Sequence, residues 1–457
     1  MNQVYDVAVI GAGVVGAAIA RELSGHDVEV VVVEARNDVG DGTSKANTAI
    51  LHTGFDAKPG TVESRLVRRG YELLSAYAPK VAIPVERTGA LLVAWTRDEL
   101  EALPSLRDKA VSNGYGRCEL VDSTDVYRRV PSLGDGALGG LTVPDESVIC
   151  TWTTSLAYAT EAKQRGAHLR FGSRVTGVSS DGGITTLRCA GGDIHARWVV
   201  NAAGLGCDLV DRMFGHDRFT VTPRRGELLV FDKQARALVD TIVLPVPSKL
   251  GKGVLVCPTI YGNVLLGPTA EDLDDRADTA TTEAGMAFLL AKGAAIMPDL
   301  LQEEVTASYA GLRAGIGDRD YLIEVDADQR YVLVGGIRST GLTSSMAIAE
   351  HVCSLLDISG LPLTPRADLP PPPQMPNLGE AFPRPYADAD RIAADPAYGQ
   401  VVCFCERVTA GEIRDALASA LPPTDLSGLR RRTRAMNGRC QGFYCGAEVN
   451  ALLERQP

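Results

Sequence analysis

The most informative part of the sequence is residues 4–34, which read VYDVAVIGAGVVGAAIARELSGHDVEVVVVE. A mostly apolar run of strand length, residues 4–10, comes first. A glycine-rich turn and a helical pattern through residue 23 follow, and residues 28–33 form a second apolar run of strand length. The order strand, turn, helix, strand predicts a βαβ unit with parallel strands.

The turn carries the pattern Gly11-x-Gly13-x-x-Gly16 between the strand and the helix. Gly11 allows a tight bend, Gly13 lets a pyrophosphate approach the backbone, and Gly16 lets the helix pack against the strand. The helix N-terminus then faces the phosphates with the positive end of its dipole. Glu34 closes the second strand, where its carboxylate can accept hydrogen bonds from ribose hydroxyls. These four residues predict a dinucleotide site, but the pattern alone does not separate FAD from NAD.

Three later segments favour a flavin. The first is rich in small residues (44–49), the second follows a strand (201–204), and the third joins a strand to a helix (335–343). A helix N-terminus aimed at an isoalloxazine ring would stabilise the anionic reduced flavin. The candidate FAD-binding residues in these segments are Ser44, Asn47, Thr48, Ala203, Gly204, Gly336, Gly341, Leu342 and Thr343.

Composition limits the classes of function. The 457 residues are 45% apolar and allow two or three domains. A net charge of −11 and only 5% aromatic residues argue against a nucleic-acid partner. The N-terminal apolar run is interrupted by glycines, is too short to span a bilayer, and has no basic segment before it. We therefore expect a cytoplasmic protein.

Four of the ten cysteines are grouped near the C-terminus, as Cys403-x-Cys405 and, after a gap of 34 residues, Cys440-x-x-x-x-Cys445. Four thiols from two loops can close around a tetrahedral metal or a [2Fe–2S] cluster. One-residue spacing is unusual for zinc, where two to four residues are typical, although a structural zinc site stays open as an alternative. Arginines at positions 430–432 and 434 lie just before Cys440. We interpret them as a cationic neighbourhood that offsets the charge of thiolate-ligated iron, with a solvated basic helix face as the alternative.

Several motifs of the first 350 residues together resemble the D-amino-acid-oxidase-like flavoproteins, and more closely the FAD-dependent glycerol-3-phosphate dehydrogenases and oxidases. They also look like L-2-hydroxyglutarate dehydrogenases, which share the His-x-Gly segment. The motifs that carry the resemblance are residues 44–54, 224–227, 251–258, 262–269, 310–313 and 336–343. Ala49 departs from the family pattern, which commonly has glycine here, so we expect a small local shift close to the flavin.

The resemblance implies an α/β fold in which a Rossmann-type FAD-binding domain is interleaved with a β-sheet substrate domain. We expect a body of residues 1–357. Its FAD-binding segments are about 1–80, 150–215 and 325–357, and its substrate-domain segments are about 81–149 and 216–324. Residues 358–398 are rich in proline and predict a semi-rigid linker. A small α-rich module of residues 399–457 holds the cysteines.

The resemblance also assigns candidate roles at the reaction site. Imidazole titrates near neutral pH, so His52 suits general-base work, and the matching histidine of the resembling oxidases has this role. The matching positions imply that Lys252, Arg313 and Ser339 line the substrate pocket, where the two cations would bind an oxyanion. From the residues alone, a histidine held in the core and two solvated cations remain the alternatives.

The C-terminal module resembles the bacterioferritin-associated-ferredoxin-like domain found in some glycerol-3-phosphate dehydrogenases, including the anaerobic type. The likeness implies a [2Fe–2S] cluster on Cys403, Cys405, Cys440 and Cys445. A cluster passes one electron at a time, so a dehydrogenase that hands electrons to a quinone, a soluble carrier or a partner subunit is expected. Resembling enzymes often associate peripherally with the membrane, so its inner face is a second expected location.

We therefore expect an enzyme that oxidises sn-glycerol 3-phosphate to dihydroxyacetone phosphate by hydride transfer to FAD N5 and passes electrons on through the cluster. Its partner would be a small phosphorylated or carboxylated alcohol. The alternatives are oxidation of a 2-hydroxy acid such as L-2-hydroxyglutarate, oxidation of an amine or imino acid, and a redox relay without a small substrate.

Overall fold

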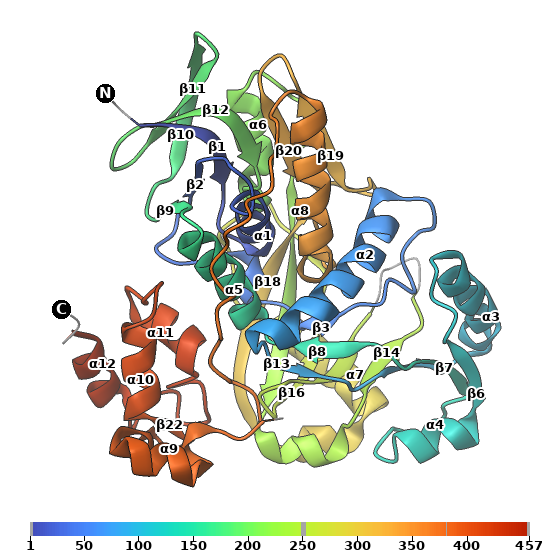
Figure 1. Cartoon of the computed structure of the whole chain (residues 1–457). Coiled ribbons are helices and arrows are strands. Elements are labelled where there is room, and N and C mark those ends of the chain that lie inside the picture. Colours follow the sequence, from blue (N-terminus) through green and yellow to red (C-terminus); the bar gives the residue numbers. More distant parts are fainter. Residues whose placement is uncertain (1–2, 248–252, 381, 455–457) are drawn as a thin grey trace.

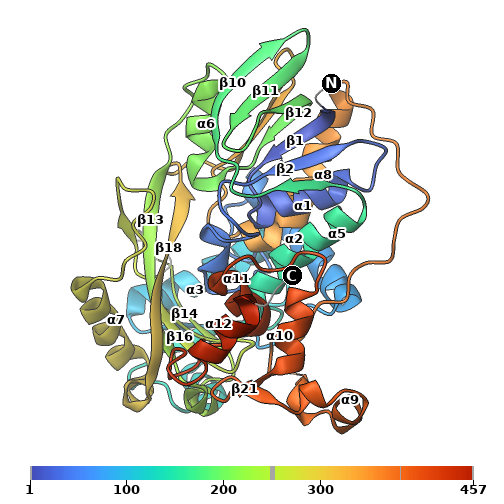
Figure 2. The ribbon, with the colours of Figure 1, turned by 90° about the vertical axis from the view of Figure 1, so that its left-hand side faces the viewer.

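The computed structural model of the chain describes residues 3–247, 253–380 and 382–454. Its body is built on two large sheets, with helices covering the first sheet on both faces (Figure 1). A small helical module at the C-terminus lies against one side of the body (Figure 2). The mixed α/β fold class expected from the sequence is confirmed.

The first sheet has eight strands and contains the βαβ unit at its centre. Strand β1 pairs in parallel with β2 on one side and with β12 on the other, and β2 pairs in parallel with β9. Strand β20 continues the parallel set beyond β12. The strands of this sheet are β1 (Val4–Ile10), β2 (Val30–Val33), β9 (His168–Arg170), β10 (Val175–Asp181), β11 (Ile184–Cys189), β12 (Ile194–Asn201), β19 (Leu322–Asp326) and β20 (Tyr331–Gly335).

Helices α1 (Val14–Leu23), α5 (Thr151–Gln164) and α8 (Gly341–Ile358) pack together beside this sheet, and α2 (Val62–Tyr77) packs on α8. Strands β1 and β2 are almost wholly buried, as expected for parallel strands with helices on both faces. Helix α6 (Cys207–Met213) belongs to the apolar core of the opposite face. The carboxyl ends of β1, β2, β12 and β20 therefore meet the first turns of α1 and α8 at one edge of the sheet, where ligands of open α/β sheets bind.

The second sheet has nine strands. Its long strands β13 and β18 pair in antiparallel fashion over their full length, from Thr222 opposite Gly315 to Phe231 opposite Val305. The strands are β5 (Ala90–Ala94), β6 (Glu119–Asp122), β7 (Gly139–Val143), β13 (Thr222–Phe231), β14 (Ile242–Pro245), β15 (Leu255–Pro258), β16 (Val264–Gly267), β17 (Glu271–Asp272) and β18 (Val305–Gly315). Helices α3 (Arg97–Ser112), α4 (Ser123–Arg129) and α7 (Glu283–Ile296) flank it.

A third, three-stranded sheet connects the two halves of the body. It consists of β3 (Ile50–Leu51), β8 (Ser147–Ile149) and β4 (Val85–Glu86), with β8 in the centre. Leu51 pairs with Ser147, so the residues that follow β3 lie beside those that precede β8. This pairing positions one part of the candidate site described below.

The proline-rich segment does not hang free of the body. After α8 the chain runs extended along the outside of the body (Figure 2), and its backbone is hydrogen-bonded to it at several points. Arg366, Met375 and Glu380 donate backbone N–H groups to the carbonyl oxygens of Gly25, Val81 and Ile260. The segment predicted as a linker is therefore tied to the body surface.

The C-terminal module has its own apolar core, which includes Val408, Ile413, Leu429 and Val449. Helix α10 starts with a capping box, in which Thr409 and Glu412 satisfy each other's backbone N–H groups. The elements of the module are α9 (Ala389–Ala394), β21 (Val401–Cys403), β22 (Val408–Thr409), α10 (Ala410–Leu417), α11 (Leu426–Thr433) and α12 (Gly446–Glu454). No helix in the part of the chain that the structure describes could cross a membrane.

Candidate functional site

The glycine turn has a shape that only glycine permits. Gly11 has φ +103°, and a Cβ on it would lie 2.6 Å from the carbonyl oxygen of Ala202. A Cβ on Gly16 would overlap the carbonyl oxygen of Gly11. The turn therefore lies directly against the segment after β12, and its glycines keep the backbone at the start of α1 free of side chains of their own, as close approach of a pyrophosphate requires.

Glu34 reaches this turn from the end of β2. Its Oε2 accepts a hydrogen bond from the Ala12 N–H (2.7 Å) and its Oε1 accepts one from the Arg36 N–H (2.8 Å). Burial raises the pKa of Glu34 above its ordinary value. The structure thus brings together the residues that the sequence predicted for a dinucleotide.

The segment predicted to follow a flavin lies beside the same turn. Ser44 Oγ accepts a hydrogen bond from the Val14 N–H (2.9 Å), at the start of α1. Asn47 Nδ2 donates to the Ser44 carbonyl oxygen, and Asn47 Oδ1 accepts from the Ala49 N–H. Ala49 has φ +56°, a left-handed conformation that glycine adopts at lower cost. This is the position where the family commonly has glycine. Thr48 lies between these two residues and is half-buried.

The other predicted cofactor residues lie on the adjoining segments. Ala203 approaches Gly11, and Gly204 opens a short 3-10 turn, Gly204–Gly206, with φ +56°. Gly336 has φ +69° in the segment before α8. Gly341, Leu342 and Thr343 are buried in the first turn of α8. Their contacts with FAD remain predictions.

His52 lies at the N-terminus of α8 and pairs with a carboxylate that the sequence did not reveal. Its backbone N–H donates to Thr343 Oγ1 (2.9 Å), and its Nδ1 lies 3.0 Å from Glu146 Oε2. Glu146 is fully buried, and its Oε1 accepts from both the backbone N–H (2.7 Å) and the hydroxyl (2.9 Å) of Thr53. A carboxylate oxygen accepts hydrogen bonds, so the pairing is made by the His52 tautomer that has its proton on Nδ1 and donates it to Oε2. Nε2 of His52 is then left as an acceptor.

Sequence reasoning missed Glu146 because nothing local distinguishes it. It follows Pro144 and Asp145 in a turn between β7 and β8, where a carboxylate is ordinarily exposed. The pairing of β3 with β8 brings it beside His52 across 94 residues of sequence. Only the three-dimensional arrangement shows the pair.

Arg313 is a partly buried cation on β18. Its Nη2 donates to the Thr269 carbonyl oxygen (3.0 Å), and no ion pair to it is found among the described residues. Burial lowers the pKa of Arg313. A Cβ on Gly226 would overlap its guanidinium, so that glycine makes room for the side chain. An uncompensated guanidinium of this kind is suited to an oxyanion.

The other cations near the site are already paired. Arg225 forms ion pairs with Glu271 and Asp278, and Arg338 forms one with Glu63. Ser339 is exposed in the turn before α8. Lys252 lies outside the described residues, so its predicted role stays a prediction. Of the predicted substrate residues that are described, Arg313 has the environment of an anion anchor.

Segment 43–52 connects the elements that carry Arg313 and His52: β18 packs against its first residues, and His52 stands at its end. The Thr43 hydroxyl donates to the carbonyl oxygen of Leu312, the residue before Arg313. Gly311 packs on the Ala46 carbonyl oxygen, where a Cβ would overlap it. The segment that contacts the glycine turn thus has β18 on one side and leads directly into β3 and His52.

The four predicted cluster ligands form two neighbouring pairs. Cys440 lies close enough to Cys405 to help raise the pKa of the Cys405 thiol, which is also raised by burial, and Cys403 stands in the same relation to Cys445. The backbone N–H groups of residues 442–444, which follow Cys440 closely, lower the pKa of its thiol. Across the described residues, no three His, Cys, Asp or Glu side chains converge as closely as a single metal ion requires. Two adjacent pairs and N–H donors to sulfur fit a cluster of two irons.

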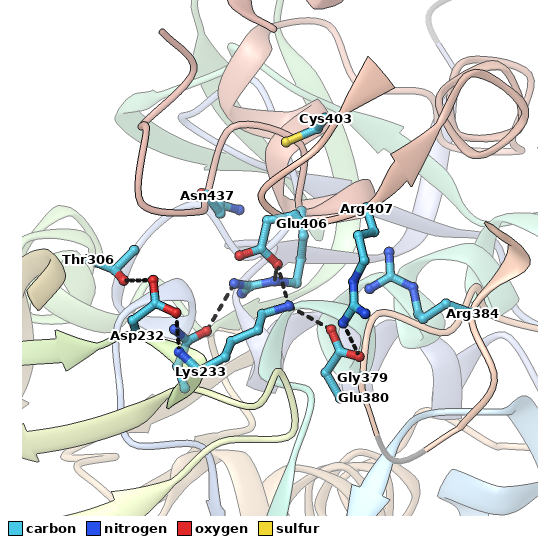
Figure 3. Close-up of polar contacts among 12 residues, drawn as sticks. Asp232, Lys233, Thr306, Gly379, Glu380, Arg384, Cys403, Glu406, Arg407 and Asn437 are labelled. Atoms are coloured by element: carbon cyan, nitrogen blue, oxygen red, sulfur yellow. Dashed lines mark hydrogen bonds and ion pairs between the residues drawn. The ribbon is translucent and has the colours of Figure 1, made fainter. Parts of the chain in front are cut away.

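The module is joined to the body by a buried ionic network (Figure 3). Glu406, the residue after Cys405, accepts a hydrogen bond from Arg434 Nε (2.8 Å) and lies 3.2 Å from Lys233 Nζ of the body. Lys233 also pairs with Glu380 (2.6 Å). Arg434 donates to Asn263 Oδ1 of the body (3.2 Å), and its guanidinium lies 4.1 Å from the centre of the Tyr261 ring.

Two of the four arginines before Cys440, Arg431 and Arg432, serve neither the predicted cationic neighbourhood of the cluster nor a solvated helix face. Arg431, Arg432 and Arg434 are buried. Arg431 Nη2 and Arg432 Nη1 each lie 2.7 Å from Asp38 Oδ2, and Arg432 Nη2 lies 2.8 Å from Asp38 Oδ1. The charges of Arg431 and Arg432 are used at the interface with the body, where Asp38 faces both, whereas Arg434 pairs with Glu406 of the module itself.

Asp38 is therefore expected to stabilise the docked module in a pH-dependent way. Burial alone would raise the pKa of Asp38, but the hydrogen bonds and charges of Arg432 and Arg431 outweigh burial and hold the pKa below its ordinary value of 3.8. A lowered pKa in the folded state contributes stability that is complete above the unfolded pKa and is lost as the pH falls through the folded pKa. The contribution should be constant at neutral pH and disappear in acid.

We predict that Asp38→Asn lowers the free energy of unfolding at pH 7 by about 3 kcal/mol, because buried Arg432 loses its counter-charge and Arg431 keeps only that of Asp41. The difference in the free energy of unfolding between this variant and the unmodified protein should stay constant between about pH 7 and pH 5. It should become smaller below about pH 4. Denaturant unfolding at several pH values measures it. Asp240→Asn, which removes an exposed ion pair with Arg236, is the control and should change little. A difference that persists unchanged at pH 3 would contradict the assignment.

The family comparisons agree with this geometry. Residues 6–355 match the FAD dependent oxidoreductase family, and residues 401–455 match the BFD-like [2Fe-2S] binding domain. The glycerol 3-phosphate dehydrogenase of Caloramator mitchellensis is 33% identical, over 99% of this chain and 94% of its own length. One subunit of the anaerobic glycerol-3-phosphate dehydrogenase of Escherichia coli K12 is 27% identical, over 99% of this chain and 89% of its own length.

A solved structure supports the fold of the body. Dithionite-reduced L-α-glycerophosphate oxidase from Mycoplasma pneumoniae, with FAD bound, matches with a TM-score of 0.77 at 27% identity. The match covers 82% of this chain and all of the oxidase. The predicted cofactors, FAD and a [2Fe–2S] cluster, are thereby confirmed. The chain belongs to the FAD-dependent oxidoreductase family and joins its flavin body to a C-terminal BFD-like [2Fe–2S] domain.

Proposed function

We propose that the protein oxidises the secondary hydroxyl of sn-glycerol 3-phosphate and so forms dihydroxyacetone phosphate. The proposal is carried by two side chains together: a histidine at the N-terminus of α8 whose Nε2 has no partner among the described residues, and a partly buried arginine on β18 that forms no ion pair with any of them. The first suits removal of a hydroxyl proton, and the second suits a phosphate. Full-length similarity to glycerol 3-phosphate dehydrogenases supports the same substrate.

In this proposal His52 accepts the hydroxyl proton on Nε2 as the carbon–hydrogen bond breaks. Glu146 holds the ring in the required tautomer and stabilises the imidazolium that forms. Arg313 fixes the substrate by its anionic end, and Lys252 is proposed to assist it. FAD, when bound, supplies the hydride acceptor at N5, and the cluster supplies a one-electron carrier. His52 and Arg313 would thus position the alcohol of the substrate between the base and the hydride acceptor.

The contacts between module and body support an onward path for the electrons. Arg434, bonded to Glu406 beside Cys405, lies over Tyr261, which stacks on Trp152 at 5.1 Å between ring centres. The Trp152 indole N–H donates to the Lys45 carbonyl oxygen in the flavin segment (3.0 Å). This unbroken series of packed groups favours a dehydrogenase that delivers electrons through the cluster to a quinone, a soluble carrier or a partner subunit.

The second candidate is oxidation of L-2-hydroxyglutarate. Arg313 would then bind a carboxylate, which its guanidinium accommodates as well as a phosphate. Product analysis separates the two. With an artificial electron acceptor present, sn-glycerol 3-phosphate should yield dihydroxyacetone phosphate at one molecule per two electrons transferred. Formation of 2-oxoglutarate from L-2-hydroxyglutarate, with no reaction of the phosphate, would reverse the assignment.

We predict that Glu146→Gln lowers kcat about 10- to 100-fold, because an amide N–H can donate to Nδ1 and so move the proton of His52 to Nε2. KM should change little, since Glu146 faces the ring and not the substrate. Stopped-flow reduction of the flavin measures the effect. Glu350→Gln, which alters an exposed pair with Arg69, is the control. Unchanged reduction by the Glu146→Gln variant across the pH range would exclude the positioning role.

A further inference from the structure

The segment 34–47 of the body lies between the glycine turn and helix α11 of the C-terminal module. On the inner side, the Gly40 N–H donates to the Ala12 carbonyl oxygen (2.9 Å), and Ser44 Oγ accepts from the Val14 N–H (2.9 Å). On the outer side, two carboxylates of the same segment, Asp38 and Asp41, contact arginines of α11. The backbone that lines the dinucleotide site is thus held from both sides.

The outer contact is unusually complete for an interface between domains. Both oxygens of Asp38 are used, since Oδ1 also accepts from the Val39 N–H (2.8 Å) and both accept from Arg432. The side chains of Asp38 and Arg432 are 5% and 4% exposed. Arg432 is fixed in turn by the carbonyl oxygens of Leu421 and Gly428. The guanidinium of Arg432 is therefore held in one orientation, and its two hydrogen bonds fix the position of the Asp38 carboxylate.

The second arginine extends the contact toward Ser44. Arg431 bridges Asp38 and Asp41, with Nη1 at 2.8 Å from Asp41 Oδ1. The same oxygen of Asp41 accepts from Lys45 Nζ (2.8 Å), the residue next to Ser44. Both arginines line a small cavity of about 10 Å³, roughly the size of one water, together with Gly40, Ser44 and Thr151. Side chains of the module therefore form part of the wall beside the predicted FAD residues.

We propose that Arg431 and Arg432 are positioning residues of the FAD site, which hold segment 38–44 in the arrangement that binds FAD. The body matches its flavoprotein family without these arginines, which belong to the second domain. FAD affinity in this chain then depends on the docked module. By thermodynamic reciprocity, bound FAD stabilises the docked module to the same extent.

The arrangement also connects the two cofactor sites. Helix α11 ends at Thr433, and three residues later the Met436 N–H donates to Cys403 Sγ (3.4 Å). Fixing the cysteine loops therefore fixes the C-terminal end of the helix whose arginines hold Asp38. If the cysteine loops lose their fixed structure, segment 38–44 should therefore become less well held, although no residue of the body has changed.

The test is FAD retention by the full-length holoenzyme, measured as free FAD fluorescence in filtrates after serial dilution. Arg432→Ala is expected to raise the dissociation constant of FAD at least tenfold, equivalent to about 1.4 kcal/mol. Arg414→Ala is the matched control, because the contacts of Arg414 that the structure describes, with Asp395, Asp415 and Tyr398, all lie away from segment 38–44. This variant should retain FAD as the unmodified protein does. Equal retention by Arg432→Ala and Arg414→Ala would overturn the proposal.

A double-variant cycle separates this role from general damage to the module. If Arg432 acts through Asp38, the double variant Asp38→Ala/Arg432→Ala should have a dissociation constant for FAD less than twofold higher than that of Asp38→Ala alone. A full additional loss would overturn the proposal. Iron content and the cluster absorbance of each variant are measured alongside. If Arg432→Ala loses iron, Asp38→Asn decides, since it leaves the module sequence intact. Weaker FAD binding with full iron supports the coupling, and unchanged FAD binding rejects it.

Discussion

Replacing His52 by alanine is expected to lower the rate of flavin reduction by substrate about 10³- to 10⁴-fold, the upper part of the range for loss of a general base. The reason is geometric. His52 Nδ1 is committed to Glu146, so Nε2 is the atom available to take the hydroxyl proton. Alanine removes this acceptor and leaves Glu146 with its two bonds from Thr53. Binding of the substrate phosphate should be nearly unaffected.

The measurement is stopped-flow absorbance of the flavin band after anaerobic mixing with sn-glycerol 3-phosphate. His168→Ala is a suitable control, because His168 is exposed on β9 and its ring is hydrogen-bonded to Tyr5, and neither residue belongs to the site. FAD content of both variants should equal that of the unmodified protein. If His52→Ala instead loses FAD, or reduces it at the normal rate, His52 is not the base.

Arg313→Ala is expected to lower kcat/KM about 10²- to 10³-fold, which corresponds to roughly 3–4 kcal/mol for a desolvated charge pair. The effect should appear mainly in KM, since the anionic end of the substrate is bound equally in the ground and transition states. This distribution is the opposite of that expected for His52. It follows from the position of Arg313, whose one polar contact in the described structure is the Thr269 carbonyl oxygen.

Arg224→Ala provides a closely matched control. Arg224 is directly opposite Arg313 in the pairing of β13 with β18, but it is half exposed and paired with Asp272. Its removal should change KM less than about threefold, as for other surface ion pairs. Equal effects of the two substitutions would show that general positive charge, and not the Arg313 guanidinium, binds the substrate.

The parts of the site that the sequence predicted are those encoded locally. The spacing of Gly11, Gly13 and Gly16 between a strand and a helix determines the turn by itself, and Glu34 follows at the end of the next strand. Their contacts agree with the prediction because a βαβ unit closes within about 30 residues. The spacing predicted two local groups of thiols, 403/405 and 440/445, but the thiols that lie together, Cys405 with Cys440 and Cys403 with Cys445, each come from different loops.

The parts that were missed depend on contacts between distant segments. Glu146 meets His52 only because β3 pairs with β8. The run of arginines before Cys440 was given a role toward the cluster because the cysteines are its nearest neighbours in sequence. Its partner Asp38 is almost 400 residues away, in a different domain. Residues at such an interface follow no periodicity or spacing in the sequence from which their contact residues in the other domain could be predicted.

The measurement that tests the central claim most directly is an anaerobic absorbance titration of the purified protein with sn-glycerol 3-phosphate and, separately, with L-2-hydroxyglutarate. Bleaching of the oxidised-flavin band reports hydride arriving on FAD. Full bleaching by the phosphate and none by the hydroxy acid is the expected result. Bleaching by L-2-hydroxyglutarate alone would assign a 2-hydroxy acid as substrate. An unchanged spectrum with both would contradict the roles given to His52 and Arg313 and favour another substrate or a redox relay.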